Sequence, residues 1–352
     1  MSVELILLSG FLGSGKTTLL LDFLRSGAAA DTAVIVNEVG EIGIDGVIVD
    51  DGSDGTVPMM MLANGCVCCS LRSSLVFTVA SVLDAVRQPG SEPLRRIVLE
   101  TSGLSRPGPI IASLADPELS RRGLRVSVLS TYDAERGSLN VETFDEAVAQ
   151  LAAANRVVFT KVDKVEASGL ALHREIMTRV NPLAELVVQT DRMTAVEQAF
   201  SPMVSQPATQ LAVQALRAWR SVDSPGDFGK SPVVMGLSAK GRDHSSIHVL
   251  LGRANANLSW DDLSQWLDDL AGGCGERLLR LKAIVKIDDA PDPVLIQSVG
   301  TTFSAPQMLS DASLDASVCV VIVRDLTADQ INGFFYDPPF SLSDSRDMSE
   351  VR

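Results

Sequence analysis

The stretch from residue 10 to residue 17 constrains the fold of this chain more than any other. It reads GFLGSGKT and fits the pattern G-x-x-x-x-G-K-[ST]. An apolar run at residues 3–8 precedes it, and a helical pattern at residues 16–25 follows. A glycine-rich loop between a buried strand and a helix can wrap a phosphate with its backbone N–H groups. Because average composition yields this pattern by chance in only about one chain in a hundred of this length, we predict nucleotide binding.

Two side chains of this loop carry chemistry. Lys16 is expected to neutralise the β- and γ-phosphates, and the Thr17 hydroxyl is expected to reach Mg²⁺. The loop residues expected to hold the nucleotide phosphates are Gly10, Gly13, Ser14, Gly15, Lys16 and Thr17.

About the first 200 residues alternate short apolar runs with longer amphipathic stretches. This alternation predicts an α/β fold, with a mostly parallel sheet covered by helices on both faces. The expected strands are residues 3–8, 33–37, 46–50, 95–100, 124–133 and 156–161. The expected helices are residues 16–25, 70–86, 141–154 and 167–180.

The composition changes near residue 201, where two proline-containing stretches bracket a short helix at residues 211–220. Beyond it the pattern predicts a small α+β domain. Its expected helices are residues 260–270 and 328–335, and its expected strands are residues 278–287, 294–299 and 317–323. We therefore predict a nucleotide-binding domain at residues 1–200, a linker at 201–232, a C-terminal domain at 233–340 and a flexible tail at 341–352.

The charge balance and the cysteine content exclude several classes of protein. The net charge of −14 argues against general electrostatic binding to nucleic acid or to an anionic membrane. No apolar run approaches the ~20 residues of a membrane span, and the N-terminus lacks the basic region of a signal peptide. Five cysteines in 352 residues are too few for a disulfide framework. We predict a cytoplasmic protein.

Residues 160–163 read TKVD after an expected strand, and they resemble the guanine-reading N-K-x-D motif with Thr160 in place of Asn. A carboxylate at Asp163 can accept from the N1–H and the 2-amino group of guanine, a donor pair that adenine lacks. The stem of Lys161 can pack on the base plane. The alternative is an ordinary surface loop, and the replacement at Thr160 implies relaxed base selectivity.

Two acidic segments follow other expected strands. Glu100 ends the RRIVLE strand, where it is suited to hold Mg²⁺ through water, and the nearby Gly103 N–H is suited to sense a γ-phosphate. Residues 37–45 carry three acids, Glu38 among them, and favour either a loop that faces a metal or a solvated acidic turn.

Three of the five cysteines, Cys66, Cys68 and Cys69, fall within four positions. Thiolates suit Zn²⁺ or Cu(I), and three of them leave a fourth tetrahedral position for an acid such as Glu38, a water or a client protein. An incompletely closed site suits metal transfer better than a purely structural role. The alternative is three buried structural cysteines.

Taken in order, the motifs GFLGSGKTT, NEVGEIGID, NGCVCC, ETSGLSRP and TKVD resemble the CobW family of P-loop GTPases, which is grouped with the hydrogenase- and urease-maturation GTPases. The C-terminal segments WDDLSQWLDDL, ERLLRLKAIVKI and VLIQSVG are also similar to that family. The resemblance implies a GTP-dependent metallochaperone or metalloenzyme activator with slow hydrolysis of GTP to GDP. It departs at residues 201–232, where many members carry a histidine-rich stretch and this chain has no histidine.

The resemblance also implies a role for each matching position. The metal ligands for Zn²⁺ or Co²⁺ would be Cys66, Cys68 and Cys69, with Glu38 as a further candidate. The phosphate and Mg²⁺ contacts would be Gly13, Gly15, Lys16, Thr17 and Thr18. Glu100 and Gly103 would take the Walker B and switch roles, and Lys161 and Asp163 would read the base.

The expected partner is a client metalloenzyme, such as a cobalt- or zinc-dependent enzyme or a protein like nitrile hydratase, and a homodimer stays open. Two other functions remain compatible with the phosphate loop. One is a GTP-gated module that binds a partner and holds a merely structural metal. The other is a P-loop kinase of small molecules, against which the TKVD segment and the cysteine cluster argue.

Overall fold

The computed structural model describes residues 3–36, 59–61, 70–85, 92–203, 247–254, 258–288, 290–309 and 317–344. The chain divides into two compact units, Met1–Ser205 and Gln206–Arg352. The linker helix predicted at residues 211–220 and the strand predicted at residues 46–50 lie outside the described residues.

The first unit contains a parallel sheet of seven strands in the order β3-β2-β4-β1-β5-β6-β7. The strands are β1 (Val3–Gly10), β2 (Thr32–Val36), β3 (Met59–Met61), β4 (Arg96–Glu100), β5 (Leu124–Asp133), β6 (Arg156–Thr160) and β7 (Glu185–Val187). The near-continuous burial of β1 explains its apolar sequence, because a central parallel strand is covered on both faces. The predicted α/β class with a parallel sheet is confirmed.

The register of the sheet gathers the carboxyl ends of four strands at one edge. Leu8 of β1 pairs with Glu100 of β4, and Gly10 of β1 pairs with Thr131 of β5. Asp133, the last residue of β5, pairs with Thr160 of β6. The loops that follow these strands therefore lie side by side, as is usual for ligand sites of open α/β sheets.

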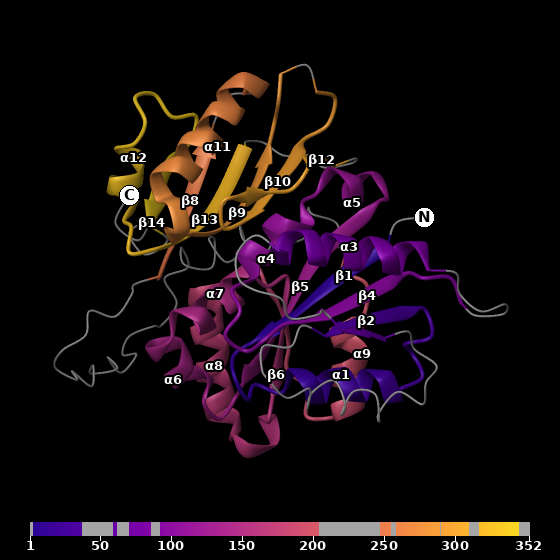
Figure 1. Cartoon of the computed structure of the whole chain (residues 1–352). Coiled ribbons are helices and arrows are strands. Elements are labelled where there is room, and N and C mark those ends of the chain that lie inside the picture. Colours follow the sequence, from indigo (N-terminus) through magenta and orange to yellow (C-terminus); the bar gives the residue numbers. More distant parts are fainter. Residues whose placement is uncertain are drawn as a thin grey trace. The chain divides into compact units, whose positions relative to one another are not determined.

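Helices cover both faces of this sheet (Figure 1). On one face α1 and α9 pack together, and the stacked rings of Phe23 and Phe200 have centroids 4.0 Å apart. α3 and α4 lie across the sheet from them, and α7 contacts β1 and β5. The helices are α1 (Lys16–Arg25), α3 (Ser70–Asp84), α4 (Pro107–Leu114), α5 (Pro117–Arg121), α6 (Gly137–Thr143), α7 (Asp145–Ala153), α8 (Ala167–Val180) and α9 (Arg192–Phe200).

The prediction of a single helix over residues 141–154 is wrong, because α6 and α7 are separate helices that meet at Phe144. The backbone of Phe144 is extended, with φ −126° and ψ 119°. Its ring stacks on Phe11 of the glycine-rich loop, with centroids 4.7 Å apart. This long-range contact, which periodicity does not reveal, accompanies the break.

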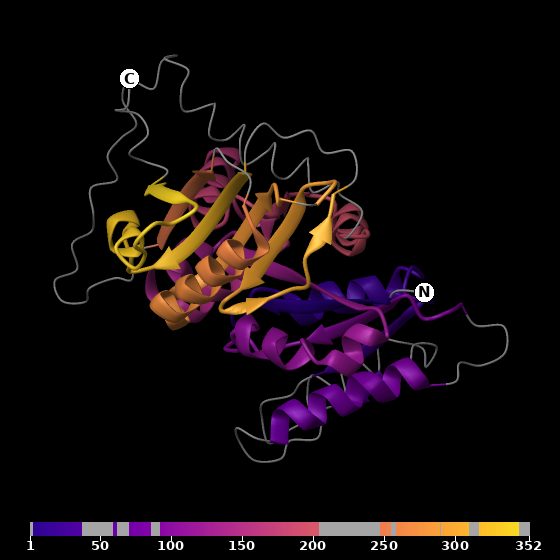
Figure 2. The same ribbon diagram turned by 90° about the horizontal axis from the view of Figure 1, so that it is seen from above.

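The second unit is an antiparallel sheet in the order β11-β10-β9-β13-β8-β14, with β12 paired to β10. Its strands are β8 (Ile247–Ala254), β9 (Leu278–Val285), β10 (Val294–Val299), β11 (Thr302–Phe303), β12 (Gln307–Met308), β13 (Ser317–Arg324) and β14 (Ser341–Asp344). α11 (Trp260–Cys274) lies across one face (Figure 2), where Trp266 and Leu270 enter the core. α12 (Ala328–Asn332) completes the predicted α+β module.

The prediction of a flexible tail from residue 341 is wrong for its first four residues, which form β14 and pair with β8. Leu342 is buried in the core, and the Asn332 side chain exchanges hydrogen bonds with its backbone N–H and C=O at 2.9 and 2.7 Å. These bonds account for an ordered strand in a polar sequence. Residues 345–352 lie outside the described part of the chain.

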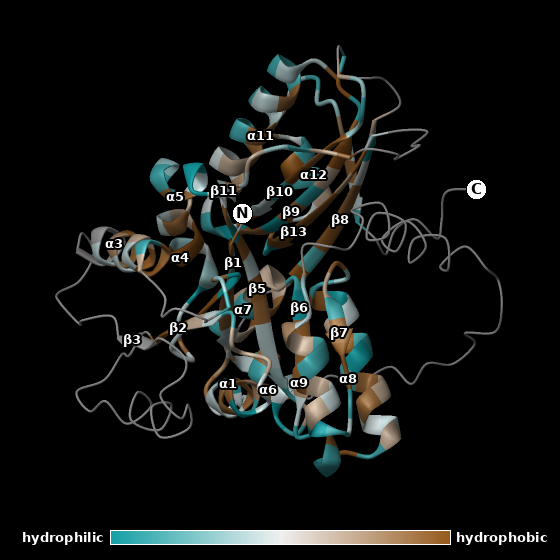
Figure 3. Cartoon of the chain, turned by 90° about the vertical axis from the view of Figure 1, so that its right-hand side faces the viewer, coloured by the Kyte–Doolittle hydropathy of each residue, from teal (hydrophilic) through white to brown (hydrophobic). Residues whose placement is uncertain are grey.

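Apolar residues gather on the strands of both sheets, and polar residues on the outer faces of the helices (Figure 3). Within the described residues, no helix combines the length and the apolar character that crossing a membrane requires.

Candidate nucleotide site

The loop from β1 to α1 has the conformation that its glycines predict. Gly13 and Gly15 adopt positive φ angles of 70° and 92°. At Gly10, with φ 142°, an added Cβ would lie 2.2 Å from the Thr131 hydroxyl oxygen. The same threonine hydroxyl is 2.6 Å from the Ser14 hydroxyl, which fastens the loop to β5. Only glycine fits at position 10 beside this pair.

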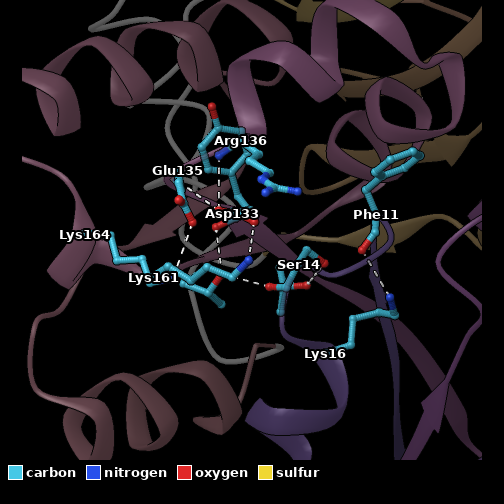
Figure 4. Close-up of polar contacts among 11 residues, drawn as sticks. Phe11, Ser14, Lys16, Asp133, Glu135, Arg136, Lys161 and Lys164 are labelled. Atoms are coloured by element: carbon cyan, nitrogen blue, oxygen red, sulfur yellow. Dashed lines mark hydrogen bonds and ion pairs between the residues drawn. The ribbon is translucent and has the colours of Figure 1, made fainter.

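Lys16 is buried at the start of α1 and folds back over the loop. Its Nζ donates to the carbonyl oxygens of Gly10 at 2.9 Å and Phe11 at 3.3 Å (Figure 4). The ammonium group therefore lies beside the loop whose backbone would hold the phosphates. Thr18, which the family resemblance implies as a phosphate or Mg²⁺ contact, is exposed on α1.

Thr17 of α1 and Glu100 of β4 meet across 83 residues of sequence, because β4 pairs with β1, the strand that leads into the phosphate loop. The Thr17 hydroxyl donates to Glu100 Oε1 at 2.7 Å, and the carboxylate is only 5% exposed. A hydroxyl and a carboxylate oxygen at this spacing form the kind of oxygen donor set that Mg²⁺ prefers. The described geometry therefore fits the predicted cation.

Gly103 lies directly against the phosphate loop. A Cβ at this position would be 2.8 Å from the backbone nitrogen of Leu12, so no larger residue fits without a shift of the loop. The segment after β4 thus has the close approach that sensing a bound phosphate requires.

The TKVD segment forms the turn after β6. The Thr160 hydroxyl donates to the Ser14 carbonyl of the phosphate loop at 2.8 Å, so this side chain joins two loops. Lys161 adopts the left-handed conformation, with φ 55°, and its Nζ donates to Asp133 Oδ2 (Figure 4). Asp163 is exposed in the short 3₁₀ helix Val162–Lys164, where its carboxylate is accessible to a ligand.

Asp133 is a site residue that the sequence pattern did not identify. Its Oδ2 accepts from Lys161, and its Oδ1 accepts from the backbone N–H groups of Glu135 at 2.8 Å and Arg136 at 3.2 Å. The side chain is 4% exposed. The available signal was an acid at the carboxyl end of a buried strand, next to the other site loops.

A buried Tyr132–His173 pair underlies this turn. The Tyr132 hydroxyl and His173 Nδ1 are 2.7 Å apart. Burial, followed by the charge of Asp133, raises the pKa of Tyr132 above its usual range. Burial lowers the pKa of His173, against the opposing effect of Asp133. Both groups are therefore neutral near pH 7, and the hydrogen bond between them joins two uncharged side chains.

The predicted metal ligands Cys66, Cys68, Cys69 and Glu38 all lie outside the described residues. In the part of the chain that the structure does describe, no three His, Cys, Asp or Glu residues are placed to hold a metal ion.

Comparison with known proteins decides the family. Residues 4–188 match the family model described as the CobW/HypB/UreG nucleotide-binding domain. This chain belongs to the CobW/HypB/UreG family. The predicted resemblance is confirmed for the second unit as well, because residues 247–336 match the cobalamin synthesis protein cobW C-terminal domain.

Curated CobW-family relatives align over most of the chain. The sequence is 30% identical to the zinc chaperone YjiA of Escherichia coli (strain K12), over 86% of this chain and 88% of that protein. It is 28% identical to the zinc chaperone CobW of Sinorhizobium sp, over 83% and 84% of the two chains.

A solved structure has the same fold. The crystal structure of Zn(II)-bound YjiA GTPase from E. coli superimposes with a TM-score of 0.59 over 95% of this chain and 98% of that one, at 22% sequence identity. The P-loop fold followed by an antiparallel C-terminal domain is therefore shared.

Proposed function

We propose that this CobW-family protein binds and hydrolyses GTP and uses the nucleotide to control delivery of Zn²⁺ or Co²⁺ to a client metalloenzyme. The observation that supports the proposed binding and hydrolysis of GTP is the Thr17–Glu100 hydrogen bond of 2.7 Å at the end of the phosphate loop. It joins the cation-binding hydroxyl and the strand-end acid that nucleoside triphosphate hydrolysis requires.

Hydrolysis of the γ-phosphate is expected to be slow and to depend on position and charge. Lys16, whose ammonium group lies beside the loop, would neutralise charge on the transferring phosphoryl group. Thr17 and Glu100 would hold Mg²⁺, which bridges phosphate oxygens and neutralises the charge that develops on them. Gly103 would meet the γ-phosphate with its N–H.

The proposed base selectivity for guanine rests on Asp163, whose carboxylate is exposed, and on Lys161, whose position is held by Asp133. The Thr160 hydroxyl donates to the phosphate loop, so base recognition depends on Asp163. A carboxylate alone still separates guanine from adenine, which lacks the two matching donors.

The metal half rests on the donor chemistry of Cys66, Cys68 and Cys69, with Glu38 as a candidate fourth ligand. Two relatives that align over most of this chain are named zinc chaperones, which favours Zn²⁺ as cargo. We further propose a cytoplasmic setting, a nucleotide-binding domain at residues 1–200, a linker at 201–232 and a C-terminal domain that begins at residue 233 and includes β14.

The deciding experiment couples the two halves. Zn²⁺ and Co²⁺ are titrated into the reduced protein against a competing chelator, with Mg²⁺ and either GDP or a non-hydrolysable GTP analogue. We expect metal affinity to differ at least ~10-fold between the two nucleotides, which corresponds to about 1.4 kcal/mol. The matched control replaces the three cysteines by serine and is expected to abolish tight binding.

Each other outcome supports a different function. Tight metal binding that ignores the nucleotide, with unfolding upon metal removal, identifies a structural metal in a GTP-gated partner-binding module. A phosphorylated small molecule in a metabolite screen would identify a kinase and contradict the proposal.

A further inference from the structure

The segment of residues 101–105, which follows β4, is held against the phosphate loop from one side. The Thr101 N–H and hydroxyl both donate to the Leu8 carbonyl, at 3.0 and 3.1 Å. Gly103 abuts the Leu12 backbone, and the Ser105 N–H closes a turn on the Ser102 carbonyl at 3.0 Å. The segment therefore forms an arch whose centre touches the phosphate loop.

Gln150 of α7 also holds the arch. Gln150 is fully buried, and its Nε2 donates to the carbonyl oxygens of Gly103 and Ser105 at 3.0 Å each. Both amide hydrogens are thus committed to the two carbonyls that flank Leu104. These bonds fix the plane of the Gly103–Leu104 peptide, and through the Gly103 Cα they restrain the preceding peptide, which carries the Gly103 N–H.

The remaining polar atom of the same side chain is unsatisfied. Gln150 Oε1 is buried and has no hydrogen-bond partner within the described structure. A buried acceptor without a donor costs free energy, and such groups are rare in native proteins.

We propose that Gln150 is a positioning residue through which the 101–105 segment distinguishes GTP from GDP. The inference rests on the proposed function, in which the Gly103 N–H meets the γ-phosphate. Because GDP lacks that phosphate, the hydrogen bonds from Gln150 affect binding of GTP and leave binding of GDP nearly unchanged.

The test uses Gln150→Met in the full chain, which keeps the length of the side chain and removes both donors. Affinities for Mg²⁺·GDP and for Mg²⁺ with a non-hydrolysable GTP analogue are measured by calorimetry. We expect the analogue to bind about tenfold more weakly, while GDP affinity stays within about twofold.

Asn181, the residue that follows α8, offers a matched control because its side chain binds the C-terminal end of α7. It is buried, and its Nδ2 donates to the carbonyls of Leu151, Ala152 and Ala154 at 2.8, 3.0 and 3.0 Å. Asn181→Leu therefore removes comparable bonds at the C-terminal end of α7 but none to residues 103 and 105. It should lower stability and leave the ratio of the two nucleotide affinities unchanged.

The possible results separate the two proposals. If the unaltered protein binds neither nucleotide, the proposed function fails and this inference fails with it. If the unaltered protein binds both and Gln150→Met keeps the wild-type ratio, or weakens both equally, only the role of Gln150 is overturned. Should the Met variant not fold, Gln150→Asn keeps an amide that is too short to reach both carbonyls, and the same ratio decides.

Discussion

At the scale of single residues, the site is held by side chains that bind one another at the ends of neighbouring strands. Thr160 joins the turn after β6 to the phosphate loop, and Asp133 joins the same turn to β5. The GKT and TKVD motifs predicted where a nucleotide would bind. Their supports were not predictable, because the bond of Lys161 to Asp133 and the bonds of Gln150 to residues 103 and 105 join positions that are distant in sequence.

Asp133→Asn tests the support of the turn that we propose to read the base. The amide oxygen of asparagine can still accept from the N–H groups of residues 135 and 136, but the charge-assisted bond to Lys161 is lost. We expect affinity for GDP to fall roughly tenfold, since hydrogen bonds to charged groups contribute about 1.5–3 kcal/mol. Titration of a fluorescent GDP analogue measures the change.

Asp116→Asn is the control for this prediction, because Asp116 also accepts a backbone N–H, that of Glu118 at 2.9 Å, but at the start of α5. Equal GDP affinity in Asp133→Asn and in the unaltered protein would show that Lys161 needs no such partner.

At the scale of elements, the long segments of strong pattern were predictable and the short ones were not. β5, α8 and β10 begin and end at the predicted residues. β7 has three residues, too few to show a period, and α9 follows it without a distinctive apolar stripe. Tertiary contacts, centred on Arg156, fix these two elements instead.

Arg156 of β6 is almost fully buried and binds both elements. Its guanidinium donates to Glu185 Oε2 of β7 at 2.7 and 2.9 Å, and to the carbonyls of Ala199 and Ser201 at 2.9 and 2.8 Å. We expect Arg156→Met to lower the free energy of unfolding by about 3 kcal/mol, because these acceptors lose their donor. Urea denaturation provides the measurement.

Arg179→Met gives the comparison, since Arg179 pairs with Glu175 on the exposed face of α8. Its loss should cost less than about 0.5 kcal/mol. Equal losses for the two arginine variants would mean that the Arg156 bonds do not organise β7 and α9.

At the scale of the whole molecule, the chain divides into two units with different sheets, one parallel and one antiparallel. The change of sequence pattern near residue 201 predicted an α/β unit followed by an α+β unit. The sequence did not reveal β14, because a short polar segment carries no strand signal until β8 offers an edge to pair with.

Two truncations test the role of β14. Removal of residues 345–352 should leave the melting temperature within about 1 °C, whereas removal of residues 341–352 should lower it by at least about 5 °C. The larger deletion takes Leu342 out of the core and exposes the edge of β8. If both truncations melt alike, β14 contributes nothing to the stability of the second unit.

The bond between Thr160 and the Ser14 carbonyl has a consequence for molecules that would compete at this site. It joins the turn after β6 to the phosphate loop, so the two segments form one surface that is already ordered without a ligand. A rigid inhibitor that contacts both segments therefore gains affinity from preorganisation, because its binding need not order either of them.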